Sequence, residues 1–411
     1  MTNLQKKILT SIATGAILLN SLTSLAFAGS TSIEISGNGS SSDNEVEVDT
    51  TTTTTVVQNN DAKISNNVDA DASTGGNDAN DNTGGDVVIN TGDANTKVDV
   101  STDVNVNSAD VDGCNCENDI DVLISGNGYK SDNEVDLDVE NEVEVFQKNN
   151  AYVYNDVWAD AKTGHNDANR NTGGDVVVRT GNAETNVDVK TKANANIAKI
   201  GGNSDGSDVD LRIVGNGSNS DNEIDLDLSQ FILLVQENNA YVYNDIWANA
   251  KTGGNDANDN TGGDVLIDTG DAEVNVEVDN LVNFNAADVD CGCLTDLLAK
   301  ISGNGSDSDN EIDADIEKEL SAFQENDADL DNDVDAEAKT GHNDAKRNTG
   351  PAGDDPVEIL TGDASSDTNV DNSGNVNIFG PSIDWDLPEL DLDFDFHFDL
   401  SLLLSLLGHL G

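Results

Sequence analysis

The sequence predicts an all-β protein: a repetitive β-solenoid or a related stacked β-structure built from four repeats of about 89 residues. Three observations lead to this prediction. The chain repeats itself at a fixed period, apolar and polar residues alternate within each copy, and turns rich in Gly, Asn, Asp and Thr separate the alternating runs. A fixed period is typical of solenoids and arrays, and alternation at period two indicates strands rather than helices.

Two blocks define the repeat. The segment Ser-Gly-Asn-Gly, with one Val-Gly-Asn-Gly variant, recurs at intervals of 89, 89 and 88 residues, beginning at Ser36, Ser125, Val214 and Ser302. The block Thr-Gly-x-Asn-Asp-Ala keeps the same intervals, beginning at Thr74, Thr163, Thr252 and Thr340. We therefore expect a signal peptide at 1–28, repeats at 29–125, 126–214, 215–302 and 303–379, and a separate C-terminal segment at 380–411.

One predicted strand begins at Ala151 in the second copy. Its constant positions are mostly apolar and read Ala151, Val153, Asn155, Val157, Ala159 and Ala161. The alternate positions vary between copies, from Lys, Ser and Asn in the first to Asp and Glu in the last. Because successive strand residues point to opposite faces, we expect the constant positions to face a core and the variable ones to face solvent.

Three further alternating or apolar runs predict strands in the first copy, at 44–48, 87–89 and 98–100, and the threonine run 50–55 also suits a strand. The runner-up architecture is a row of four small β-domains, one per repeat. The inner positions carry few large apolar residues, which disfavours an ordinary sandwich core and favours a thin solenoid core.

An asparagine occupies the apolar parity in every copy, at Asn66, Asn155, Asn244 and Asn332. A buried amide needs hydrogen-bond partners. In stacked strands such residues can bond to one another and form a ladder. The alternative is an asparagine at a strand edge that bonds to turn backbone.

The N-terminus predicts export. Lys6 and Lys7 precede an apolar stretch over 8–25, and Ala26-Phe27-Ala28 forms a small-x-small cleavage site. The chain carries 19 basic and 80 acidic residues, a net charge of −61. Nucleic acid and anionic lipid are therefore excluded as partners, because both are bound through Lys and Arg. No later apolar run reaches the length of a membrane span, so we expect a secreted or cell-surface protein.

Aromatic residues form the leading candidate binding site, which we name the aromatic stripe. Its members lie on the variable, outward parity of the second and third copies: Tyr152, Tyr154, Trp158, Tyr241, Tyr243 and Trp247. Exposed aromatic patches mark binding sites, and flat rings beside carboxylates suit a carbohydrate or a protein partner. The competing interpretation is that these rings pack under a neighbouring coil or loop.

Two other groups suggest chemistry. The turns supply hard oxygen ligands suited to calcium at Asp78, Asn80, Asp81, Asp86 and Asp93, with solvated turn acids as the default interpretation. In an exported protein the even cysteine count suggests disulfides among Cys114, Cys116, Cys291 and Cys293, without fixing their pairing. We expect no other cofactor.

No catalytic set stands out. Gly76 and Gly254 occupy the positions that His165 and His342 hold in the other copies, so a turn position explains these histidines. The tail alternates Leu and Phe with Asp over 391–400, which suits either a cap on the solenoid or an assembly strand.

The consensus Thr-Gly-Gly-Asn-Asp-Ala-Asn-Asp-Asn-Thr-Gly-Gly-Asp-Val followed by Thr-Gly-Asp-Ala, seen at 74–94 and 252–272 and with His at 163–183, resembles secreted repeat proteins of bacterial surfaces. The resemblance covers most of 33–378 and implies surface exposure, with no catalytic residues to carry over. Gln-x-Asn-x-Ala pieces such as 147–151 are similar to curlin-type amyloid repeats, which are shorter and less charged.

The function expected is that of an exported acidic repeat protein of the cell surface or extracellular matrix. It would be structural or adhesive and would bind through the aromatic stripe. The alternative is a self-assembling fibre or sheet subunit that takes a second copy of itself as partner. A polysaccharide-active enzyme ranks below both, because no acid pair stands out from the repetitive background.

Overall fold

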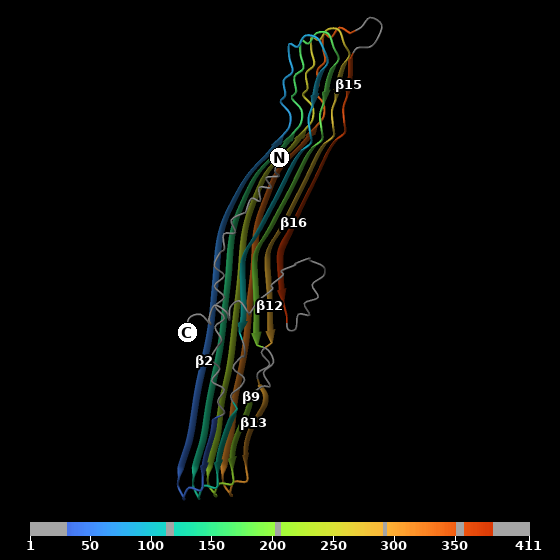
Figure 1. Cartoon of the computed structure of the whole chain (residues 1–411). Coiled ribbons are helices and arrows are strands. Elements are labelled where there is room, and N and C mark those ends of the chain that lie inside the picture. The colour runs from blue at the N-terminus through green and yellow to red at the C-terminus, as the bar shows by residue number, and fades with distance from the viewer. Residues whose placement is uncertain (1–30, 112–118, 202–206, 291–293, 351–356, 381–411) are drawn as a thin grey trace, which may run out of the picture.

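The computed structural model describes residues 31–111, 119–201, 207–290, 294–350 and 357–380 (Figure 1). Four strands recur in four successive coils. Coil 1 contains β1 (Thr31–Ser36), β2 (Asp43–Ser73), β3 (Val87–Asn90) and β4 (Ala94–Val111). Coil 2 contains β5 (Ile120–Ser125), β6 (Asp132–Lys162), β7 (Val176–Arg179) and β8 (Ala183–Gly201). Coil 3 contains β9 (Ser207–Val214), β10 (Asp221–Lys251), β11 (Val265–Asp268) and β12 (Ala272–Asp290). Coil 4 contains β13 (Leu294–Ser302), β14 (Asp309–Lys339), β15 (Val357–Leu360) and β16 (Ala364–Phe379).

Every sheet takes one strand from each coil. The short sheet is β1-β5-β9-β13, the long sheet β14-β10-β6-β2, the turn sheet β15-β11-β7-β3 and the return sheet β16-β12-β8-β4. All pairs are parallel and keep equivalent residues in register, as Ala62↔Ala151 and Ala151↔Ala240 illustrate. The predicted stacked all-β structure is confirmed. The row of four small domains is wrong, because each strand pairs with strands of other repeats.

The long strands are more continuous than the sequence runs suggested. The runs at 44–48 and 50–55 and the strand beginning at Ala62 are parts of the single 31-residue strand β2. Side chains of one parity point inward along its whole length, so no kink separates the runs. A strand of that length extends about 100 Å, whereas four coils stack to only about 19 Å. The molecule is therefore a narrow blade whose long axis follows the strands (Figure 1).

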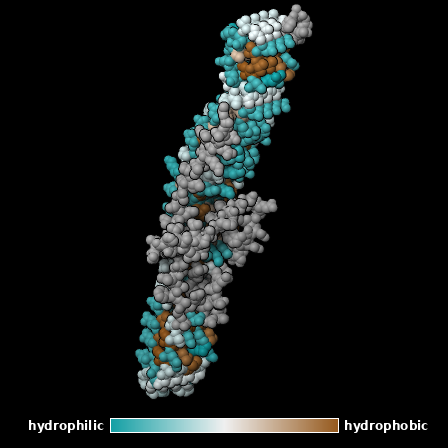
Figure 2. All heavy atoms as spheres, in the orientation of Figure 1, coloured by the Kyte–Doolittle hydropathy of each residue, from teal (hydrophilic) through white to brown (hydrophobic). Residues whose placement is uncertain are grey.

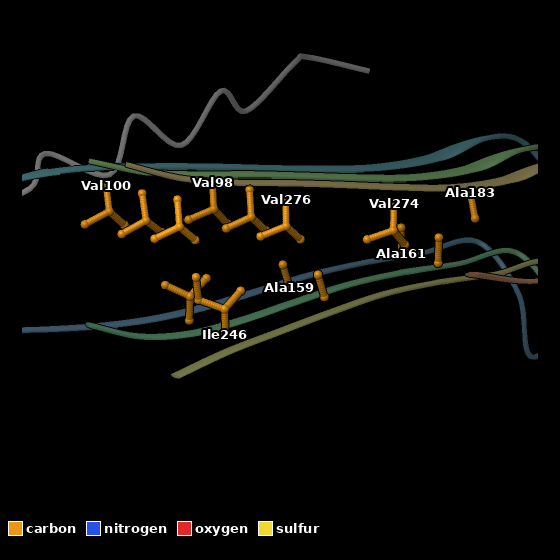
Figure 3. Packing of buried hydrophobic residues seen from close by; sticks show 14 of the residues in the cluster. Val98, Val100, Ala159, Ala161, Ala183, Ile246, Val274 and Val276 are labelled. Carbon is orange, nitrogen blue, oxygen red and sulfur yellow. The ribbon is translucent and has the colours of Figure 1, made fainter. Parts of the chain in front are cut away.

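The core is a thin layer between the long sheet and the sheets opposite it. Val98, Val100 and Val276 of the return sheet face Ala159 and Ile246 of the long sheet (Figure 3). At the other end of the blade, the short sheet packs its Ile and Val residues on the first residues of the long strands. Small and β-branched side chains suit this spacing because the two layers approach closely.

A left-handed asparagine reverses the alternation in each return strand. Asn105, Asn194, Asn283 and Asn375 have φ between 55° and 65°. In β4 the buried positions are even-numbered up to Thr102 and odd-numbered from Asn107 onward. The Asn194 side chain crosses the core and donates to Asn239 O at 2.6 Å. Asparagine tolerates this conformation better than most residues and supplies the amide for that bond.

The predicted asparagine ladder is confirmed. Nδ2 of each residue donates to Oδ1 in the next coil, from Asn66 to Asn155 at 2.7 Å, from Asn155 to Asn244 at 2.6 Å and from Asn244 to Asn332 at 2.6 Å. Other inward amides form similar ladders, beginning at Asn44, Asn60 and Asn107. A glutamine ladder beginning at Gln58 runs in the opposite direction. These ladders satisfy buried amides that would otherwise be costly.

Turn residues fit the close stacking. A Cβ on Gly164 would lie 1.9 Å from Gly253 O, so this turn position requires glycine. The neighbouring position is left-handed in all copies, with φ of 73° at Gly76, 61° at His165 and 64° at His342. The turn interpretation of the two histidines therefore agrees with their backbone conformation.

The described residues include no helix that is long and apolar enough to span a membrane. The predicted boundaries at 125, 214 and 302 coincide with the ends of β5, β9 and β13. The predicted signal peptide at 1–28 and almost all of the segment 380–411 lie outside the described residues.

Candidate functional site: the aromatic stripe

The aromatic stripe lies on the outer face of the long sheet. Strand register places Tyr152 beside Tyr241, Tyr154 beside Tyr243 and Trp158 beside Trp247. Their alternate neighbours, such as Val153 and Val157, are buried in the core. The structure thus brings all six predicted residues together on one face, with two rings per position along the strands.

The rings stack on one another between coils. The Trp158 and Trp247 centroids are 3.7 Å apart with an interplanar angle of 27°, and the Tyr154 and Tyr243 centroids are 5.3 Å apart at 5°. Tyr152 and Tyr241 are tilted by 40° at 6.3 Å. Part of the competing interpretation therefore holds, since each ring packs against a neighbouring coil. These stacks add to the stability of the parallel register.

The rings nevertheless remain open to solvent. Trp158 is 47% exposed and Tyr152 is 53% exposed, whereas Tyr243 and Trp247 of coil 3 are half-buried. Lys251 Nζ lies over the Trp247 ring, 5.9 Å from its centroid, and the lysine side chain partly covers that ring. The more exposed side of the stripe is therefore the side that belongs to coil 2.

Polar residues border the stripe on both sides. In coil 1 the register partners are Lys63, Ser65 and Asp69, and in coil 4 they are Asp329, Asp331 and Asp335. Partial burial, followed by the negative field of Asp245, Asp333 and Asp331, raises the pKa of the Tyr243 hydroxyl above its ordinary value. This hydroxyl stays protonated at physiological pH and can donate a hydrogen bond to a partner.

Hydrogen bonds between coils engage four of the five predicted calcium ligands. Oδ1 of Asn80 accepts from Asn169 N at 2.6 Å, Oδ1 of Asp86 from Asp175 N at 3.1 Å, and Oδ1 of Asp93 from Asn182 N at 2.8 Å. Asp81 pairs with Arg170. The fifth, Asp78, forms an isolated bridge with Asp167 through its backbone. In the described part of the chain no group of three His, Cys, Asp or Glu side chains is placed to hold a metal ion. Calcium binding stays a prediction.

At one turn position the equivalent residues of successive coils lie side by side and form a column of alternating charges. Arg170 donates to Asp81 through Nε at 2.6 Å and through Nη2 at 2.9 Å, and Arg347 binds Asp259 in the same two-pronged way. The guanidinium groups hold the pKa of Asp81 and of Asp259 below the usual value, chiefly by hydrogen bonding. This column was not predicted from the sequence. Its signal was the alternation Asp, Arg, Asp, Arg at one repeat position.

Like-charged columns cover the outer face of the first third of each long strand. Asp138 neighbours Asp227, and Glu134 neighbours Glu223. Partial burial, and then adjacent carboxylates, raise the pKa of Glu134, Asp136, Glu223 and Asp227. These columns oppose stacking at neutral pH, so the apolar core and the amide ladders must outweigh them.

The predicted disulfide residues Cys114, Cys116, Cys291 and Cys293 all lie outside the described residues. Comparison of the chain with protein-family models, with curated proteins and with solved structures found no match.

Proposed function

We propose that this protein is an exported structural and adhesive protein of the cell surface or extracellular matrix. It binds a carbohydrate or protein partner through the aromatic stripe. One observation carries the proposal: six aromatic residues gather on the outer face of a flat parallel sheet while both flanking coils present polar residues there. An aromatic cluster of this kind on an otherwise acidic face is typical of a recognition surface.

The geometry favours one approach by the partner. Tyr154 and Trp158 each stack one face on a ring of coil 3, and the opposite face looks toward coil 1, where the side chains of Ser65 and Asp69 are short. A sugar ring or an apolar side chain can rest there with its polar groups near Lys63 and Asp69. Because the chain carries a net charge of −61, the expected partner is neutral or basic.

The experiment replaces Tyr154 and Trp158 with Ser together and measures binding to an array of immobilised oligosaccharides and to a panel of purified extracellular-matrix proteins. The proposal predicts a partner whose affinity falls at least about fivefold, because two stacked aromatic contacts contribute about 0.5–1.5 kcal/mol each beyond area burial. Val88→Ser is the matched control, since Val88 is 61% exposed but lies in the turn sheet. Undiminished binding by a folded double variant would refute the proposal.

A further inference from the structure

We infer that the coil 4 end of the blade is a docking surface for coil 1 of a second copy, so that molecules stack head to tail into an open ribbon. The first observation concerns backbone edges. In all four sheets the outermost strands belong to coil 1 at one edge and to coil 4 at the other. Within the described residues these outer strands have one neighbour each, and unpaired strand edges template further pairing.

Apolar side chains are exposed at the coil 4 end. Ile312 is 46% exposed and Ile316 is 48% exposed, although their register partners Ile224 and Leu228 in coil 3 are buried. Further apolar residues of coil 4 are also exposed although their register partners in coil 3 are buried: Leu320, Ile359, Val370 and Phe379. Figure 2 shows apolar surface toward the two ends of the long axis, in the regions labelled β15 and β13 in Figure 1. In coils 2 and 3 the next coil covers the equivalent positions, which is what a second copy would do.

The amide ladders give the stack a direction. Each Asn in the ladder that starts at Asn66 donates toward the next coil, so at coil 4 the Asn332 amide is left pointing out of the stack. Its contact is the 3.4 Å one with Asn372 of its own coil, whereas Asn244 makes the equivalent 3.3 Å contact with Asn280 and a 2.6 Å bond to the next coil as well. By the same geometry the Oδ1 of Asn66 points outward at coil 1. Head-to-tail stacking pairs donor with acceptor, whereas two coil 4 ends would pair donor with donor.

Charges at the two ends are complementary in four columns. Following each column to its ends places Lys300 against Glu34, Asp329 against Lys63, Asp367 against Lys97, and Arg347 against Asp81 of the next copy. The Asp–Arg alternation would thus continue unbroken across the junction. Like charges meet in a larger number of columns, such as Asp309 with Asp43, Glu311 with Glu45 and Asp335 with Asp69, and like-charged neighbours stack in the same way inside one molecule.

The segment beyond Gly380 is a poorer occupant of this surface. The stretch 381–411 is about as long as β14 alone, and a stretch of that length does not cover four sheet edges. It contains no Asn or Gln, so it cannot extend the amide ladders, and Pro381 and Pro388 offer no backbone N–H. A second copy matches every ladder.

The resulting assembly is a ribbon whose axis follows the stacking direction of the coils. A head-to-tail contact repeats without closing and therefore produces an open filament. Each molecule would add about 19 Å along the ribbon axis, and the strands, lying across that axis, would make the ribbon about 100 Å wide.

Glycines at the ends provide the sharpest test. A Cβ on Gly253 would meet Gly341 O at 1.8 Å, but a Cβ on Gly341 itself meets nothing within 4 Å, because coil 4 is the last. Gly39 at the coil 1 end is equally free, although a Cβ on its counterpart Gly128 would collide with it. Gly341→Ala and Gly39→Ala should therefore leave the single molecule folded and still block the junction. Gly380→Ala is the matched control. Gly380 follows Phe379, which pairs with Ala287, so its equivalent in coil 3 is Asp288, and this position already accepts a side chain.

The experiment follows the chain lacking the predicted signal peptide at micromolar concentration, by negative-stain electron microscopy and sedimentation velocity, with circular dichroism to check folding. We expect ribbons about 100 Å wide for the wild type and Gly380→Ala, and at least about a tenfold loss of assembled mass for the other two glycine variants. Reversing the exposed coil 4 charges (Lys300→Glu, Asp329→Lys, Asp367→Lys) should also block assembly. Adding Glu34→Lys, Lys63→Glu and Lys97→Glu to the same chain should restore it.

Four results would overturn the inference. In the first, the wild type stays a single molecule at all concentrations, and in the second, folded Gly341→Ala still forms ribbons. In the third, the variant with reversed coil 4 charges does not regain assembly when the coil 1 charges are reversed as well. In the fourth, assembly requires residues 381–411. Assembly that appears only after that segment is deleted would identify the segment as the occupant instead. Gly39 and Gly341 lie outside the long strands that carry the stripe, so the results of the glycine variants are independent of those for Tyr154 and Trp158.

Discussion

Removing one rung of the central amide ladder should destabilise the fold strongly. Asn155 is fully buried, accepts from Asn66 at 2.7 Å and donates to Asn244 at 2.6 Å. In Asn155→Ala the Asn244 carbonyl loses its donor inside the core, while the Asn66 amide keeps a 3.2 Å contact with Thr102 Oγ1. A buried polar group left without a partner costs about 1–3 kcal/mol, and the second bond adds about 1 kcal/mol, so we expect a loss of about 2–4 kcal/mol.

Urea denaturation followed by circular dichroism measures this loss. Asn67→Ala is the control, because Asn67 is an exposed neighbour in the same sheet whose amide makes a long, 3.5 Å contact with Asp156. Exposed substitutions of this kind change stability by less than about 0.5 kcal/mol. If Asn155→Ala shifted the midpoint no more than Asn67→Ala does, the ladder would contribute no net stability and the reasoning would be refuted.

Three further predictions follow. Gly164→Ala should lower the free energy of unfolding by more than about 3 kcal/mol, because its Cβ would lie 1.9 Å from a carbonyl oxygen. Gly341→Ala, at the equivalent position of coil 4, should leave the stability of the single molecule unchanged. Equal melting temperatures of the two variants would contradict the stacking. Burial and neighbouring carboxylates raise the pKa of Glu134 and Asp227, so the folded state binds more protons than the unfolded state. At low salt the melting temperature should therefore rise as pH falls from 7 toward 4.5 and 3.8, the ordinary pKa values of Glu and Asp. A melting temperature that falls over that window would contradict this prediction. Expression in a bacterium should yield a mature chain that begins at Gly29, and N-terminal sequencing that finds Met1 would oppose export.

Much of the fold was predictable because inward positions tolerate few residue types. The constant parity at Ala151, Val153 and Asn155 identified both the core face and the ladder, since stacked coils place identical residues beside one another. The six stripe residues were predicted as outward for the same reason.

Other features depend on register or on residues with weak patterns. The threonine run 50–55 carries no apolar residues, so it did not indicate that β2 is one strand. Gln58 and Asn60 point inward on the same parity as Val46, and this shared parity was the available signal for a continuous strand. The strand Thr31–Ser36 was missed, although Ile33 and Ile35 alternate with polar residues in it. Stacking of the rings and pairing of Arg170 with Asp81 both follow once equivalent positions of successive coils are neighbours, and the sequence alone left that register open.

In-register stacking of the four repeats can be tested most directly by a distance between the outermost coils. Spin labels placed on Asp69 and Asp335 through non-cysteine chemistry, in chains diluted with unlabelled protein, report the separation of coil 1 and coil 4 along one column. Three strand spacings put the two backbones about 14 Å apart, so the labels should lie within about 25 Å of each other. A separation above about 40 Å, as in a row of four separate domains, would contradict the account.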